Sequence, residues 1–150
     1  MARTKFRLES VLRYRKSVEQ KWQAEVARTL SEMVGEQQRR TECEHERAAG
    51  HQRLTAELGD GLDGLAVRAY SDYLRGIDAR IEESVTREQQ LEKILRQKQR
   101  TLLQATKDRK VVDRLKEIAR EREGHEVRVA EQKEIDDFAA LRHARGETGA

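Results

Sequence analysis

Apolar residues recur along residues 74–112 at alternating steps of three and four, the spacing of one face of a coiled-coil helix. Twelve positions follow this rhythm, and eight of them are apolar: Leu74, Ile77, Ile81, Leu91, Leu95, Leu102, Ala105 and Val112. About four would be expected by chance from a hydrophobic content of 36%. The stripe therefore predicts a long helix, and it shifts at its end to Leu115, Ile118 and Ala119.

The first third of the chain carries a second apolar stripe. Its members are Leu8, Val11, Leu12, Val18, Trp22, Val26, Leu30, Met33 and Val34. Between residues 35 and 53 the stripe thins to Cys43, Ala48 and Ala49, before Leu54 and Leu58 restore it. We expect residues 35–53 to be the most loosely paired part of the two stripes.

One segment, Gly59-Asp60-Gly61-Leu62-Asp63-Gly64, reads as a turn. Gly59 can end a helix in the left-handed conformation, and Asp60 or Asp63 can cap the next one. The pattern predicts helices over about 4–58 and 65–145 with a turn at 59–64. Two such helices should fold back as an all-α antiparallel coiled-coil hairpin, a single domain over residues 1–150.

The two predicted helices differ in length. At 1.5 Å per residue the first would be about 80 Å long and the second about 120 Å. We therefore expect roughly the last 25 residues to extend past the N-terminus, by the same rise per residue. This overhang has a weak apolar stripe with no intramolecular partner: Val127, Val129, Ile135, Phe138 and Leu141.

Composition supports a helical interpretation and argues against a globule. Charged residues make up 39% of the chain, aromatic residues only 4%, and there is no proline. A compact domain needs more apolar material, whereas disordered chains are usually rich in proline and lack periodic apolar residues. Nothing approaches the apolar length of a membrane span, and the lone Cys43 fits a reducing cytoplasm.

The sequence contains no pattern typical of catalysis or of cofactor binding. His45, His51, His125 and His143 are scattered, and Cys43 lies two residues from His45, so the pair does not share a helical face. Glycine-rich phosphate loops and nucleophile motifs are absent. We expect a non-enzymatic protein without a metal or a cofactor.

Basic residues concentrate in two segments that the hairpin would bring together. Residues 1–16 contain Arg3, Lys5, Arg7, Arg13, Arg15 and Lys16 against Glu9 alone, and residues 96–122 contain ten bases against four acids. One interpretation is a solvated face of a charged helix pair. The other is a binding surface for an acidic partner, which could be a protein, a phosphate backbone or a lipid headgroup.

A second candidate surface lies just after the turn, at Tyr70, Tyr73, Leu74, Ile77 and Ile81. Leu74, Ile77 and Ile81 are most simply members of the stripe. Tyr70 and Tyr73 lie partly off it, and tyrosines are enriched at binding surfaces. A partner site and ordinary packing both remain open for this segment.

Together these features resemble the flagellar export protein family FliJ. The resemblance rests on the opening Phe6-Arg-Leu8-Glu-Ser-Val11-Leu12-Arg-Tyr-Arg15-Lys, on the single break near residue 60, and on the closing Glu134-Ile-Asp136-Asp137-Phe138-Ala139-Ala-Leu-Arg142. It covers nearly the whole chain, although such motifs recur in other coiled coils. The stalk proteins of type III secretion and of rotary ATPases share the architecture. The sparse stripe at 35–53 departs from the pattern.

The resemblance implies a stalk and adaptor of the flagellar type III export apparatus at the cytoplasmic face of the membrane, without insertion into it. Its joined termini would enter a FliI-like ATPase hexamer, and it would also contact the cytoplasmic domain of a FlhA-like export gate and escort chaperones or substrates. On this basis the ATPase contacts would be Arg3, Lys5, Arg7, Arg13, Arg15, Lys16, Arg109 and Lys110. The gate contacts would be Tyr70, Tyr73, Leu74, Ile77 and Ile81.

Two other functions compete with this one. A nucleic-acid-binding coiled coil would use the same basic segments on phosphates, and its affinity would fall steeply with salt as counterions are released. A generic chaperone clamp is the third possibility. The near balance of 31 basic and 28 acidic residues argues against nucleic acid, and we expect none as a partner.

Overall fold

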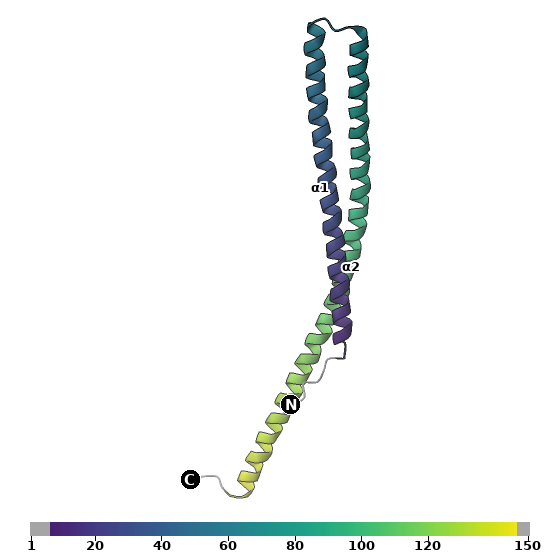
Figure 1. Cartoon of the computed structure of the whole chain (residues 1–150). Coiled ribbons are helices and arrows are strands. Elements are labelled where there is room, and N and C mark those ends of the chain that lie inside the picture. Colours follow the sequence, from purple (N-terminus) through teal and green to yellow (C-terminus); the bar gives the residue numbers. More distant parts are fainter. Residues whose placement is uncertain (1–6, 147–150) are drawn as a thin grey trace. The chain divides into compact units, whose positions relative to one another are not determined.

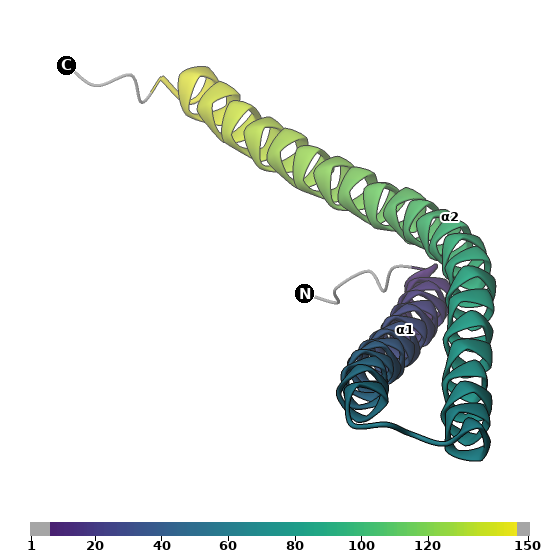
Figure 2. The same ribbon diagram turned by 90° about the horizontal axis from the view of Figure 1, so that it is seen from above.

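The chain forms two long α-helices, α1 (Glu9–Gly59) and α2 (Gly64–Ala144), in a computed structural model that describes residues 7–146. The helices pack against each other and run antiparallel from the turn that joins them (Figures 1 and 2). The predicted all-α helical hairpin is confirmed. Residues 7 and 8 form a turn, so α1 begins later than predicted, while residues 4–6 lie outside the described part.

The turn is closed by glycine geometry and by one capping aspartate. Gly61 has a φ of 86°, a conformation that favours glycine, and its amide donates to the Leu58 carbonyl at 3.3 Å. Asp63 Oδ1 accepts the Ala66 amide at 2.8 Å and so caps α2. The left-handed residue is therefore Gly61 and not Gly59, which keeps helical geometry at the end of α1.

Contacts along the helices divide the chain into two compact units. One unit comprises residues 20–104 and contains the turn, and the other comprises residues 1–19 with 105–150. In the first unit the buried apolar side chains are Leu74, Ile77, Leu91 and Leu95. In the second they are Leu12, Ala105 and Val112. Each unit therefore combines a part of α1 with a part of α2.

The predicted stripe of α2 faces α1. All twelve positions of the 74–112 rhythm are buried or half-buried, including the four polar ones, Ser84, Glu88, Lys98 and Arg109. The alternating three- and four-residue spacing thus includes polar residues. Whether a side chain of α2 faces α1 depends on its position in this repeat, and not on apolar character alone.

The predicted stripe of α1 is right in part. Leu12 is buried, and Val18, Trp22, Val26 and Met33 are half-buried. By contrast Leu30 is 45% exposed and Val34 is 52% exposed, and the buried residue at this level is Thr29. Counting in steps of three and four from Leu12 leads to 22, 26, 29 and 33, so Leu30 lies one position off the stripe.

Candidate interaction surfaces

Tyr73 lies in a polar cluster that crosses from α2 to α1. Its hydroxyl donates to Glu46 Oε1 at 2.6 Å, and Arg80 Nη2 lies 3.5 Å from both carboxylate oxygens of Glu46. The hydrogen bond from Tyr73 lowers the pKa of Glu46 and raises that of the tyrosine. Tyr73 remains 44% exposed, so the ring is held in place while part of it faces solvent.

The other four residues of the Tyr70–Ile81 segment are more enclosed. Leu74 is 6% exposed and Ile77 is fully buried, while Tyr70 and Ile81 are half-buried. A hydrogen bond to Glu57 raises the pKa of Tyr70. Leu74, Ile77 and Ile81 thus pack in the helix interface, and Tyr73 is the exposed member that a partner could reach.

Close packing at Leu74 depends on Gly50 of α1. Gly50 is buried, and a Cβ atom at this position would lie 2.8 Å from Leu74 Cδ2 and 3.5 Å from Tyr73 Cε1. A methyl group would therefore require the leucine to move. The glycine brings the backbone of α1 close to the segment that carries Tyr73.

Polar contacts replace apolar ones where the α1 stripe thins. Glu36 is only 8% exposed, accepts a hydrogen bond from Ser84 Oγ at 3.3 Å and pairs with Arg39 at 2.8 Å. Arg40 Nε and Glu88 Oε1 form an ion pair at 3.3 Å, although neither atom makes a hydrogen bond within residues 7–146. Nearer the turn, Arg47 pairs with Asp78 at 2.9 Å. The looseness expected for residues 35–53 stays a prediction.

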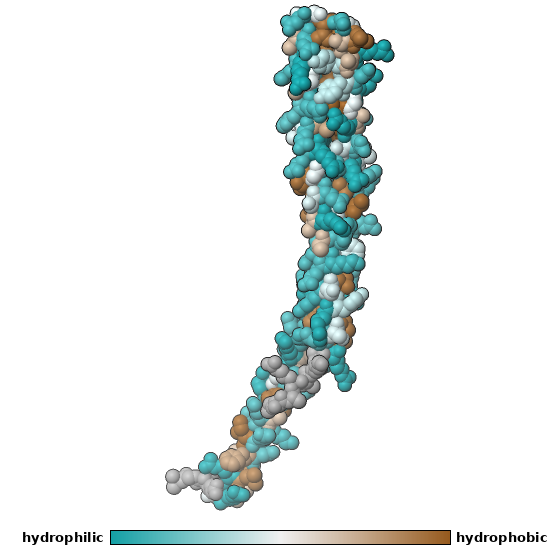
Figure 3. Space-filling model, viewed as in Figure 1, coloured by the Kyte–Doolittle hydropathy of each residue, from teal (hydrophilic) through white to brown (hydrophobic). Residues whose placement is uncertain are grey.

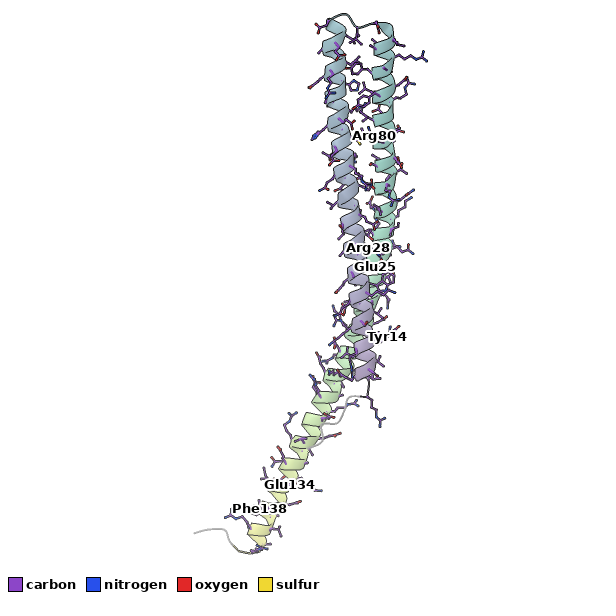
Figure 4. The ribbon with its side chains drawn as sticks, in the orientation of Figure 1. Tyr14, Glu25, Arg28, Arg80, Glu134 and Phe138 are labelled. Atoms are coloured by element: carbon purple, nitrogen blue, oxygen red, sulfur yellow. The ribbon has the colours of Figure 1, made fainter. Side chains whose placement is uncertain are left out.

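The buried Thr29 and two half-buried charged residues form a polar trio further along the same unit. Lys98 Nζ donates to Glu25 Oε2 at 2.9 Å and to Thr29 Oγ1 at 3.0 Å, and the threonine hydroxyl donates to the Glu25 carbonyl at 3.0 Å. The lysine lowers the pKa of Glu25. Glu25, labelled in Figure 4, thus links α1 to α2 through charge.

The basic segments meet in the other unit, where acidic residues separate them. Cross-helix ion pairs join Arg15 to Asp108 at 3.4 Å and Lys116 to Glu9 at 2.8 Å. Arg109 hydrogen-bonds Glu19, which also accepts from Thr106, and these donors lower the pKa of Glu19. The predicted juxtaposition is correct, but Arg15 and Arg109 are occupied by intramolecular carboxylates.

Part of the basic set remains available to a partner. Exposed bases without an ion-pair partner among the described residues of this unit include Arg7, Arg13, Lys16, Lys107 and Lys110. Tyr14 is 63% exposed, with the Arg15 guanidinium 5.8 Å from its ring centre. Arg3 and Lys5, two of the predicted contacts, lie outside the described residues.

The last part of α2 has no helix beside it among the described residues of its unit. Glu9, the first residue of α1, pairs with Lys116, and from residue 125 to residue 144 every side chain is exposed. The exposed apolar residues here are Val127, Val129, Ile135, Phe138 and Leu141. Figure 4 labels Glu134 and Phe138, and Phe138 is 64% exposed.

The described part of the structure has no cluster of metal ligands and no membrane-spanning stretch. No group of three or more histidine, cysteine or carboxylate side chains within residues 7–146 could hold a metal ion. Neither helix has a stretch within this range that is long and apolar enough to cross a bilayer. A hollow of about 510 Å³ beside Cys43 is lined by Arg39, Arg80 and Arg87 and by the acids Glu36, Glu42 and Glu83, so its charges balance.

Sequence reasoning missed the buried polar residues of α1. Thr29, Glu36 and Glu19 are 2%, 8% and 9% exposed, and none was singled out by its chemistry. Their burial could have been predicted from their positions, because all three fall on the alternating three- and four-residue spacing that starts at Leu12.

Comparison with known proteins identifies a family. The sequence model of the family described as "Flagellar FliJ protein" matches residues 4–148. No curated protein and no solved structure matches the chain significantly. Because the family match spans nearly all of the 150 residues, the protein belongs to the FliJ family of flagellar proteins.

Proposed function

We propose that this protein is a non-enzymatic stalk and adaptor of the flagellar export apparatus. The end of α2 and the exposed bases beside it enter the ring of a FliI-like ATPase, and the Tyr73 surface contacts the cytoplasmic domain of a FlhA-like gate. Escort of chaperones or substrates belongs to the same proposal. So does a position in the cytoplasm, peripherally bound at the membrane.

The observation that carries the proposal is the solvated end of α2. A helix of about 20 residues with five large apolar side chains in water gains little from tertiary packing. Binding in an enclosed channel would bury those side chains and stabilise the helix. The exposed bases Arg13, Lys16 and Lys110 of the same unit would add attraction to acidic or carbonyl groups at the channel entrance.

The apolar end of α2 is tested first. Phe138→Ser with Leu141→Ser should weaken binding to the export ATPase by about tenfold or more, because buried anchors dominate interfaces. The matched control is Leu103→Ser with Val34→Ser, two similarly exposed apolar residues of the other unit. Co-sedimentation with the assembled ATPase ring measures both. If the two variants bind the ATPase ring equally well, the end of α2 does not contact the ring.

The exposed bases are tested separately. Arg13→Glu with Lys16→Glu leaves the Arg15–Asp108 and Arg109–Glu19 pairs intact, and we expect it to weaken ATPase binding. The control reverses Lys93 and Arg100, two exposed bases of the other unit. If both double variants bind like the wild type, the basic residues are a solvated face.

The gate contact is tested at Tyr73 alone. Ile77 is fully buried, so its truncation would test folding as well as binding. Tyr73→Ala should reduce binding to the gate domain while circular dichroism stays unchanged. Tyr14→Ala, which alters a more exposed tyrosine of the other unit, should bind normally. Loss of helicity together with binding would favour a packing role for Tyr73.

A nucleic-acid-binding function has weaker support. The cross-helix carboxylates Glu9, Glu19 and Asp108 lie among the bases and reduce the positive potential that phosphates need. Duplex DNA binding with a steep salt dependence, abolished by the reversal of Arg13 and Lys16, would favour this rival.

A further inference from the structure

The turn end of the hairpin carries exposed leucines. Leu58 ends α1 at 49% exposure, Leu62 is half-buried in the turn, and Leu65 at the start of α2 is 78% exposed. Leu65 is the most exposed large hydrophobic side chain among the described residues. Figure 3 shows hydrophobic surface gathered at this end of the hairpin. We call Leu58, Leu62 and Leu65 the tip leucines.

The turn does not require the tip leucines. Its geometry comes from Gly61 in the left-handed region, from backbone hydrogen bonds that Asp60 and Gly61 donate to the end of α1, and from the Asp63 cap. A turn built this way is usually polar, and the exposed Leu58 and Leu65 do not take part in its hydrogen bonds. Grouped apolar side chains on a surface mark an interaction site more often than single ones do.

The charged residues of the segment 54–67, which lies between Arg53 and Arg68, are all acidic. Residues 54–67 contain Glu57, Asp60 and Asp63 and no lysine, arginine or histidine, although the whole chain has a formal charge of +3. Glu57 accepts a hydrogen bond from Tyr70 and Asp63 accepts one from Ala66, so two of the three carboxylates have fixed positions. Asp60 lies between them in the turn and is exposed.

We propose that the tip leucines and their three carboxylates bind a basic amphipathic helix of a partner protein. The apolar face of such a helix would cover Leu58, Leu62 and Leu65, and its lysines or arginines would pair with Glu57, Asp60 and Asp63. The same carboxylates disfavour two other occupants. Anionic lipid headgroups would be repelled, and two tips placed together would oppose like charges.

This surface lies outside both contacts of the proposed stalk function. The tip surface includes neither the Tyr73 cluster nor the end of α2, so the proposal for the tip does not depend on the proposed contacts with the export ATPase and the gate. Failure of the tip experiment would leave the ATPase and gate experiments unaffected.

Two model peptides provide the probe. One is a short helix with a leucine face and a lysine face, and the other has glutamate in place of every lysine. Binding of each labelled peptide to the full-length protein is followed by fluorescence anisotropy. We expect the lysine peptide to bind, with an affinity that falls as salt rises, and the glutamate peptide not to bind.

Variants locate the binding. Leu58→Ser with Leu65→Ser should raise the Kd of the lysine peptide by about tenfold or more. Leu103→Ser with Val34→Ser, which alters two exposed apolar residues of the same unit away from the turn, should change it by about twofold or less, as peripheral contacts do. Asp60→Lys is an independent test, because an exposed turn residue can change without loss of packing, and it should also weaken binding.

The outcomes separate the alternatives. Unchanged affinity in both the leucine variant and Asp60→Lys would overturn the proposal and place the peptide on another acidic segment. Concentration-dependent dimerisation that Leu65→Ser abolishes would overturn the proposal, because it would show that a second copy of this protein covers the tip leucines. Binding of uncharged lipid vesicles through the tip leucines, with no binding of the lysine peptide, would overturn it in favour of a membrane surface.

Discussion

Individual polar residues carry much of the specificity of the helix pair. Glu36, Thr29 and Lys98 occupy positions where a coiled coil would usually place apolar side chains, and each contacts a polar partner. A buried charge that lost its partner would destabilise the fold strongly, whereas a matched pair contributes little net stability. These residues therefore favour the observed register of α1 against α2 over neighbouring ones.

The titration of Tyr73 reports its contact with Glu46. The carboxylate accepts a hydrogen bond from the tyrosine hydroxyl and raises the pKa of the phenol above 10.0. Glu46→Gln should lower that pKa toward its ordinary value, measured by the ultraviolet absorbance of tyrosinate in a background with Tyr14→Phe and Tyr70→Phe, where Tyr73 is the remaining tyrosine. Glu57→Gln should act on Tyr70 instead. A Tyr73 pKa that is unchanged in Glu46→Gln would contradict the hydrogen bond.

Truncation of the most buried residue has a large expected effect. Ile77 is fully buried between the helices, so Ile77→Ala should lower the free energy of unfolding by about 2–5 kcal/mol. Ile94→Ala is the matched control, because Ile94 is 43% exposed on the same helix and should cost much less. Urea denaturation measures both. Similar losses of unfolding free energy in the two variants would argue against the observed orientation of α2, in which Ile77 faces α1.

Glycines within the two helices differ in what surrounds them. Gly35 and Gly76 have no atom within 4 Å of a hypothetical Cβ, whereas Gly50 faces Leu74 at 2.8 Å. Glycine in a helix interior is destabilising relative to alanine in open surroundings. At Gly50 the helix preference of alanine opposes the space that the interface leaves. The role of a glycine in these helices therefore depends on what lies opposite it.

Alanine at these positions distinguishes the two effects. Gly35→Ala and Gly76→Ala should each stabilise the protein by about 0.5–1 kcal/mol through helix propensity. Gly50→Ala should gain nothing or destabilise, because the new methyl group displaces the buried Leu74 side chain. Urea denaturation compares the three. A gain at Gly50 equal to that at Gly35 would show that the helices do not approach closely there.

At the scale of the whole molecule, acidic residues stabilise both units through contacts between the helices. Glu9 and Glu19 belong to one unit, and Glu25 and Glu46 belong to the other. Hydrogen bonds from Lys116, Arg109, Lys98 and Tyr73, respectively, lower their pKa values below 4.5. The ionised carboxylates therefore favour the folded chain at neutral pH.

This linkage predicts acid sensitivity. A carboxyl group whose pKa is lower in the folded state contributes stability above its unfolded pKa and loses it as pH falls through the folded value. The free energy of unfolding should thus decrease as pH falls below 4.5, where the unfolded chain takes up protons first. Glu19→Gln should flatten this dependence, and the exposed Glu134→Gln should not. An identical slope in Glu19→Gln would contradict the role of Glu19.

Local patterns determined the helices, the turn and the facing of α2. Each depends on residues close in sequence. The absence of proline permits long helices, three glycines in six residues form the turn, and the repeat from Leu74 to Val112 places all twelve of its positions against α1. The exposed apolar residues at the end of α2 could be predicted for the same reason, because a longer second helix must extend past the first.

Only the tertiary structure decided which side chains meet across the helices. Apolar character favoured Leu30, but the interface buries Thr29, because Lys98 of α2 supplies a partner for its hydroxyl. Arg15 and Arg109 were expected to contact an ATPase ring, and the structure pairs them with Asp108 and Glu19, so that contact stays a prediction. For Leu74 and Ile77 the sequence left both packing and a partner contact open, and the structure buries both side chains. Burial and charge pairing arise between residues far apart in sequence. The periodicity of one helix therefore determines which of its faces is packed, but not which side chains of the other helix that face contacts.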